Sequence, residues 1–280
     1  MVQLILNMAR EDVQNYLIDA LDKILSEYNI AFIKWDMNRN VSEPGWETAP
    51  GDARELWVRY VQGLYHVWGT LQKRHPQVIW QSCASGGGRA DLGILRLADQ
   101  IWTSDNTEPI ARLNIQEGFS QFLPANTMEA WVTDWGRDTV PLRFRFHVSM
   151  AGSLGIGGNL NEWDEWDRDL AADCIQLYKE IRPVIQFGDQ YRLISPQKNA
   201  FSAVQYVSKD QSESVLFAFR VFLPDPANLP VIYLRGLNPT AIYEVEGYDE
   251  PRSGKGWMSA GLKVELGNLR SAVIKITQVQ

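Results

Sequence analysis

Cysteine is scarce in this sequence, since only Cys83 and Cys174 occur among 280 residues. Two thiols cannot form the disulfide framework of a small secreted scaffold. The opening segment also lacks the basic region and the small-residue cleavage site of a signal peptide. We therefore expect a reduced protein in the cytoplasm.

Long hydrophobic runs and clusters of positive charge are missing as well. Nowhere do about 18 apolar residues follow one another, so we expect no membrane span. The 27 lysines and arginines are outnumbered by 34 aspartates and glutamates, which gives a formal net charge of -7. Because a phosphate backbone binds to clustered basic residues, we expect no nucleic-acid partner.

Histidine is rare too, and its positions exclude two classes of site. His66, His75 and His147 do not have the spacing of metal ligands. The sequence also lacks a G-x-S-x-G elbow for a Ser-His-Asp triad. We therefore expect neither a metal site nor a serine hydrolase.

What the sequence does contain, up to about residue 185, is an alternation of short apolar runs with longer amphipathic ones. This pattern is typical of repeated βα units with a parallel sheet. The expected strands are 2–6, 30–36, 77–83, 100–104, 128–133 and 153–157. The expected helices are 11–28, 53–75, 110–122, 138–150 and 165–182, the last of which ends at Arg182-Pro183.

After about residue 190 the pattern changes to short alternating segments, such as 201–207, 215–221 and 271–277. These segments predict an antiparallel β-domain of about eight strands. We therefore predict two domains, a (β/α) domain at 1–187 and a β-sandwich domain at 188–280.

The number of parallel strands has a consequence for the fold. A closed (β/α)8 barrel needs about 250 residues and eight strands, whereas this portion offers about 185 residues and six strands. The expected fold class is therefore α/β, a (β/α)8-type barrel that lacks about two N-terminal strands, followed by the antiparallel domain. Open edges of an apolar parallel sheet are an aggregation hazard. We expect a second copy or a complementing chain to cover them.

The first chemically suggestive segment follows the strand at 30–36, which runs through Lys34 and Trp35 into Asp36, with Asn38 beyond it. Active sites of parallel barrels lie at the C-terminal ends of the strands, where Asp36 falls. Lys34 points to the same side of the strand and could lower the pKa of Asp36. The alternative is a structural salt bridge at the end of the strand.

The second segment runs from Cys83 through Ser85 and three consecutive glycines, Gly86 to Gly88, to Arg89. Glycines let the backbone approach a ligand and expose its N–H donors. The spacing does not fit a dinucleotide loop, and no Gly-Lys-Ser/Thr ending follows, which argues against a phosphate loop. Cys83 itself is expected to be a buried apolar residue, because no base lies near it in sequence.

The third segment ends in Asp105, shortly before Pro109, which can begin a helix. Asp105 is either a helix cap or a carboxylate in a pocket. Together with Asp36 it would supply the two carboxylates that cleavage of a glycosidic bond requires. Their separation decides between retention and inversion, and sequence does not give it.

At these three segments the sequence resembles the bacterial α-galactosidases (melibiases) of glycoside hydrolase family 36, and the resemblance extends along nearly the whole chain. The motifs are Lys34-Trp35-Asp36 and Ser104-Asp105-Asn106-Thr107. The resemblance implies that Asp36 is the nucleophile and Asp105 the general acid/base. The candidate substrate-binding residues are Lys34, Trp35, Asn38, Cys83, Ser85, Gly86 and Arg89.

The activity implied by the resemblance is hydrolysis of terminal α-D-galactosyl residues of melibiose- and raffinose-type oligosaccharides by double displacement, with no cofactor. Two alternatives stay open. The chain could be a catalytically silent or partner-dependent sugar-binding fragment of such an enzyme, or it could transfer galactose to another sugar.

Overall fold

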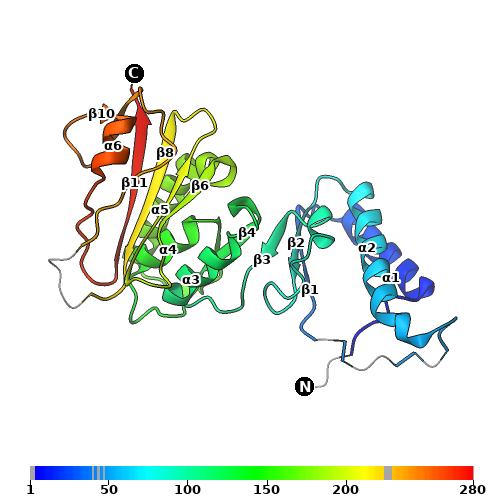
Figure 1. Ribbon diagram of the computed structural model, residues 1–280. Helices are drawn as coiled ribbons and strands as arrows, with labels where there is room; N and C mark the ends of the chain where they lie inside the picture. Colours follow the sequence, from blue (N-terminus) through cyan, green and yellow to red (C-terminus); the bar gives the residue numbers. More distant parts are fainter. Residues whose placement is uncertain (1–3, 40, 43–44, 47, 224–228, 280) are drawn as a thin grey trace. The chain divides into compact units, whose positions relative to one another are not determined.

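The computed structural model describes residues 4–39, 41–42, 45–46, 48–223 and 229–279. The chain forms two compact units, Met1–Asp105 and Asn106–Gln280, and each is described by itself (Figure 1). No helix within the described residues is long and apolar enough to cross a membrane.

The first unit is a parallel sheet with two helices. Strand β2 pairs in parallel with both β1 and β3. Helices α1 and α2 lie side by side (Figure 1). The strands are β1 (Phe32–Asp36), β2 (Ile79–Cys83) and β3 (Gln100–Trp102). The helices are α1 (Glu11–Glu27) and α2 (Leu56–Arg74), with 3-10 turns η1 (Ala53–Glu55) and η2 (Ile94–Arg96).

An aromatic cluster joins α2 to this sheet. Trp68 of α2 is fully buried, and its ring stacks on that of Trp35 in β1, with 5.3 Å between the centroids and 10° between the planes. The ring of Trp80 in β2 lies 5.5 Å from that of Trp68. Stacked and tilted aromatic pairs stabilise a contact beyond the apolar area that they bury, so this cluster helps to fix α2 on the strands.

The second unit begins with helices and two more parallel strands. Strands β4 (Met128–Val132) and β5 (Ser153–Ile156) pair in parallel. The helices are α3 (Pro109–Phe119), α4 (Leu142–Met150), α5 (Glu165–Phe187) and α6 (Gly254–Ala260), with 3-10 turns η3 (Ala125–Thr127) and η4 (Leu160–Glu162).

The remainder of the second unit is an antiparallel sheet, in which six strands of the described chain follow the order β10-β9-β11-β8-β7-β6. Helices α4 and α5 lie against this sheet (Figure 1), and apolar residues of both helices and of β7 and β8 form one core. The strands are β6 (Asp189–Ile194), β7 (Phe201–Val207), β8 (Glu213–Arg220), β9 (Ile242–Val245), β10 (Arg252–Ser253) and β11 (Arg270–Gln278).

The expected fold class, parallel strands with helices followed by an antiparallel β-domain, is confirmed. The strand predicted at 2–6 is wrong for residues 4–6, which form no strand, and residues 2 and 3 lie outside the described part. The division at 187/188 stays a prediction.

The helix stop predicted at Arg182-Pro183 is wrong, because α5 continues through Pro183 to Phe187. A proline inside a helix removes one hydrogen bond and costs about 3 kcal/mol. Val184 and Ile185, directly after it, are buried in the core of the unit. We attribute the continuation of the helix to this burial, which offsets the cost of the proline.

Gly63 provides a test of the packing of the first unit. A Cβ atom at Gly63 of α2 would lie 1.8 Å from the carbonyl oxygen of Met8. Gly63→Ala therefore has to push the backbone around Met8 away from α2. We expect a loss of about 1–3 kcal/mol in the free energy of unfolding, measured by urea denaturation.

Gly69→Ala in the same helix is the matched control, because among the described residues its Cβ would meet only the side chain of Leu97, at 3.5 Å. Alanine at Gly69 is expected to be neutral or to stabilise the helix by up to about 1 kcal/mol. Equal urea midpoints for the two variants would contradict the close approach at Gly63.

His147 provides a pH test in the second unit. It lies on α4, 4% exposed, with Nδ1 2.9 Å from Oγ of Ser271 in β11. Burial lowers the pKa of His147 to about 4, and the charge of Arg143 acts in the same direction. The unfolded chain, with a histidine pKa near 6.5, therefore binds a proton that the folded chain rejects.

Stability contributed by neutral His147 is present above about pH 6.5, falls as the pH drops towards 4, and is constant below that. The loss is on the order of 3 kcal/mol. His147→Gln should remove it, so the difference in unfolding free energy between the two proteins should change across this window in urea titrations. A difference that is the same at pH 7 and pH 4 would refute the assignment.

Candidate active site

The register of the three parallel strands gathers polar side chains on one face of the sheet. Lys34 is paired with Gln81 and Asp36 with Cys83, while Gln81 is paired with Gln100 on its other side. Side chains two positions apart on a strand point to the same face. The residues that share this face are Lys34, Asp36, Gln81, Cys83, Gln100 and Trp102.

Asp36 stands at the C-terminal end of β1 and accepts hydrogen bonds from its neighbours. Nδ2 of Asn38 donates to its Oδ2 over 3.0 Å. The thiol of Cys83, its register partner on β2, also donates to the carboxylate. The Asp36 side chain is thereby held at the end of the strand.

These contacts set the charge of the carboxylate. Partial burial acts to raise the pKa of Asp36, but hydrogen bonds from Cys83, Asn38 and the Met37 N–H, together with the charge of Lys34, outweigh it. The pKa of Asp36 therefore lies below its ordinary value, and the group is an anion at neutral pH.

Cys83 is buried, as expected, but it is also a donor. Burial raises the pKa of its thiol to about 11, and the hydrogen bond to Asp36 contributes in the same direction. At neutral pH the side chain is therefore a thiol that keeps its proton, and it can donate that proton to Asp36.

The glycine-rich loop after β2 adopts an unusual backbone conformation. Ser85 has a φ of 50° and Gly86 a φ of 88°, both in the left-handed region. A Cβ atom at Gly86 would lie 2.7 Å from Cα of Ser104 and 3.3 Å from the N atom of Asp105. Only glycine fits this position, because the loop packs directly against the segment that carries Asp105.

Asn38 connects this loop to Asp36. While its Nδ2 donates to Asp36, its Oδ1 accepts from the N–H of Ser85 over 3.3 Å, and the Ser85 hydroxyl lies 3.4 Å from the same oxygen. Both polar atoms of the Asn38 side chain thus contact the protein.

Arg89 supports the site through contacts with the protein. Its Nη2 donates to the carbonyl oxygens of Trp35 over 2.8 Å and of Cys83 over 3.1 Å, and its Nε donates to Oγ of Ser82. The guanidinium therefore links the C-terminal ends of β1 and β2.

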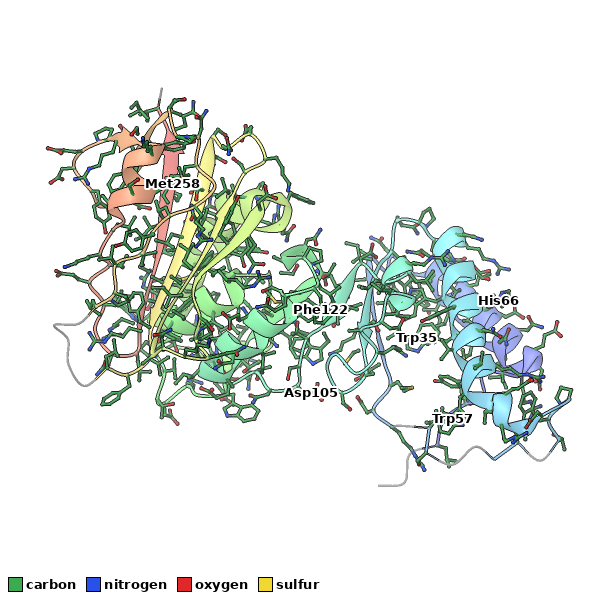
Figure 2. All side chains as sticks on the ribbon, in the orientation of Figure 1. Trp35, Trp57, His66, Asp105, Phe122 and Met258 are labelled. Atoms are coloured by element: carbon green, nitrogen blue, oxygen red, sulfur yellow. The ribbon has the colours of Figure 1, made fainter. Side chains whose placement is uncertain are left out.

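Asp105 is exposed and follows β3 on a loop, as Figure 2 shows. Its Oδ1 accepts a hydrogen bond of 2.8 Å from Nε1 of Trp102. Glu108, and not Asp105, caps α3, since Oε2 of Glu108 accepts from the N–H of Ala111. The alternative role of Asp105 as the helix cap is therefore wrong, whereas the helix start at Pro109 is confirmed.

Lys34 and Trp35 lie on opposite faces of β1. Nζ of Lys34 lies over the ring of Trp102, 4.6 Å from its centroid. The Trp35 ring stacks on Trp68 of α2, and Figure 2 shows it between the strands and that helix. The Trp35 side chain therefore points away from Asp36.

A surface hollow of about 630 Å³ borders the carboxylate of Asp36. Lys34 and Asn38 also line it, together with apolar residues of α1 and of the segment before it. Small-molecule sites typically measure about 300–1,000 Å³. Cys83 and Asp105 do not line this hollow.

Trp102 has no role in the site predicted from the sequence. The feature of the sequence that points to Trp102 is its position at the end of β3, three residues before Asp105.

No group of three or more His, Cys, Asp or Glu side chains suited to hold a metal ion occurs among the residues that the structure describes. The described site offers two carboxylates with thiol, amide, indole and ammonium neighbours.

Comparison with known proteins identifies one family along the chain. Residues 1–188 match the Melibiase family, and residues 201–276 match the glycosyl hydrolase family 36 C-terminal domain.

Two curated relatives illustrate the similarity in sequence. The chain is 38% identical over 250 residues to Alpha-galactosidase AgaA of Geobacillus stearothermophilus, which covers 88% of this chain and 34% of the relative. It is 39% identical over 266 residues to Alpha-galactosidase C of Emericella nidulans, which covers 93% of this chain and 34% of the relative. The chain thus spans about a third of the length of these relatives.

Solved structures agree with the sequence comparison. The crystal structure of a variant of GH36 alpha-galactosidase AgaA in complex with raffinose matches with a TM-score of 0.94 at 34% identity, covering 99% of this chain and 39% of that chain. AgaB from Geobacillus stearothermophilus matches with a TM-score of 0.94 at 36% identity and the same coverage.

The contact between Asp36 and Cys83 can be tested by alkylation. Asp36→Asn keeps the size of the side chain but removes the charge that helps to raise the thiol pKa. A lower pKa means more thiolate, the reactive form, so we expect iodoacetamide to label Cys83 a few-fold faster at pH 8. Peptide mass spectrometry measures the rate at each cysteine.

Cys174 is the internal control, because it is also buried with a pKa raised to about 11, through burial rather than through Asp36. Its rate should not change. Equal acceleration at both cysteines would indicate general loosening of the fold, and no acceleration at Cys83 would argue against the contact.

Proposed function

Because the chain belongs to the Melibiase family of glycoside hydrolase family 36, we propose that it carries the catalytic carboxylates of a retaining α-galactosidase, with Asp36 as nucleophile and Asp105 as general acid/base. The observation that carries the proposal is the environment of Asp36. Its carboxylate lies at the C-terminal end of β1, and donors from Cys83 and Asn38 lower its pKa. A nucleophile of this kind has to be an anion.

The proposed reaction has two displacements. Asp36 attacks the anomeric carbon while Asp105 gives its proton to the departing oxygen, so that a covalent galactosyl-enzyme forms and the aglycone leaves as an alcohol. Asp105, now a carboxylate, takes a proton from water. That water displaces Asp36 from the anomeric carbon, and galactose leaves with its original configuration.

We assign different roles to the other candidates. Lys34, Cys83, Ser85 and Gly86 would contact the galactose, because Lys34 and Cys83 share the face of Asp36 and the loop residues lie beside Asn38. The protein contacts described above favour holding roles for three others. Asn38 would orient Asp36, Arg89 would fix the strand ends, and Trp35 would pack α2 on the sheet.

The proposed substrates are terminal α-galactosides of the melibiose and raffinose type. AgaA of Geobacillus stearothermophilus has been solved with raffinose and with stachyose, and this chain shares its fold at 34–35% identity. The cytoplasmic location expected from the sequence stays a prediction.

A second chain, identical or complementary, is part of the proposal. Within the described residues β1 pairs only with β2, and Phe32 at its start is 45% exposed. Leu4 and Leu6 are 89% and 56% exposed. This apolar surface favours a partner chain in solution.

Release of 4-nitrophenol from 4-nitrophenyl α-galactoside by the purified chain tests the function. Asp36→Asn should lower kcat/KM by at least about 10³-fold, because it removes the nucleophile. Asp19→Asn, at an exposed site on α1, is the matched control and should leave kcat/KM unchanged.

The first galactose anomer seen by NMR decides the stereochemistry, and α-galactose is expected. Undiminished turnover in Asp36→Asn would overturn the assignment of the nucleophile. No turnover by a folded sample, with light scattering showing a monomer, would favour the silent or partner-dependent fragment. Galactosyl transfer products at high sugar concentration would favour the transglycosylase.

A further inference from the structure

Trp102 is the residue in contact with Asp105 to which neither the motifs nor the comparisons assign a role. It is 3% exposed at the end of β3, and its indole Nε1 lies 2.8 Å from Oδ1 of Asp105. Asp105 itself is exposed on a loop. A buried donor therefore holds one oxygen of an exposed carboxylate.

We infer that Trp102 is a positioning residue for Asp105. The indole N–H of Trp102 binds Oδ1 of Asp105, and Oδ2 is therefore the oxygen that carries the proton to the leaving group. This inference rests on the proposed function of Asp105. An indole has one N–H and no acceptor, so it can hold only an oxygen that keeps a lone pair available. Protonation of Oδ1 would weaken this bond, whereas protonation of Oδ2 preserves it.

Lys34 connects Trp102 to the side of the nucleophile. Its ammonium lies 4.6 Å from the centre of the Trp102 ring, on the sheet face that also carries Asp36. A cation over an indole face is attracted to the ring and draws electron density from it. The N–H becomes a better donor, so Lys34 strengthens the hydrogen bond to Asp105 through the Trp102 ring.

Trp102→Phe tests the inference, because it removes the N–H but keeps an aromatic ring for Lys34 and for the core. Trp80→Phe is the matched control. Trp80 is a fully buried tryptophan of the adjacent strand β2, and its Nε1 has no hydrogen-bond partner among the described residues. Both variants lose the same atoms, but only Trp102→Phe releases a carboxylate.

The first readout compares two leaving groups. The sugar that leaves from raffinose needs a proton, whereas 4-nitrophenolate is stable enough to leave without one. We expect Trp102→Phe to lower kcat/KM for raffinose by about tenfold and for 4-nitrophenyl α-galactoside by less than about threefold. Trp80→Phe should change both substrates by the same factor. Equal losses in Trp102→Phe would overturn the inference.

The second readout does not need turnover. In the ¹H–¹⁵N spectrum of the chain labelled with ¹⁵N-tryptophan, the indole signal missing from Trp102→Phe is that of Trp102. Asp105→Ala should shift this signal because its acceptor is lost, whereas Asp36→Ala should leave it in place. If the Trp102 indole signal does not shift in Asp105→Ala, the inference is overturned, whether or not the wild-type chain is active. If the signal shifts but the chain is inactive, the hydrogen bond from Trp102 to Asp105 is supported, and it is the proposed function that fails.

Discussion

The parallel register of β1, β2 and β3 is the constraint on which the described site depends. A shift of one residue along β1 would turn every side chain of that strand to the other face. Asp36 would then meet α2, and Trp35 would lie beside Cys83. The stack of Trp35 on Trp68 prevents this shift, because it buries a large aromatic surface only in the observed register. Aromatic packing on one face of the sheet thus determines the polar chemistry on the other.

The two carboxylates are held by donors of different strength. Asp36 accepts from a thiol and an amide, while Asp105 accepts from an indole. The thiol of Cys83 keeps its proton at neutral pH, since burial and the neighbouring Asp36 raise its pKa to about 11. Its apolar surroundings and its polar role are therefore compatible at neutral pH.

Local periodicity in the sequence predicted several elements well. The period of two places Lys34 and Asp36 on one face, and the helical spacing over 11–28 corresponds to α1 within one residue. Features that depend on tertiary packing were missed. Pro183 marks a helix end by local rules, but burial of Val184 and Ile185 carries α5 past it. Asp105 is a preferred cap by residue type, but the start of α3 at Pro109 makes Glu108 the cap.

The same limit explains why a polar residue beside a predicted site is a weak guide to ligand contact. Asn38 and Arg89 have the chemistry of sugar-binding side chains, yet their described contacts are with Asp36, with the glycine-rich loop and with the ends of two strands. At the ends of strands, backbone carbonyl oxygens no longer have a neighbouring strand as hydrogen-bond donor. A parallel sheet therefore requires side-chain donors at the same edge where substrates bind. A side chain that meets this need cannot bind a sugar with the same atoms. Fewer polar side chains are therefore available to bind a ligand than the motifs suggest, because some of them hold the remaining site residues in place.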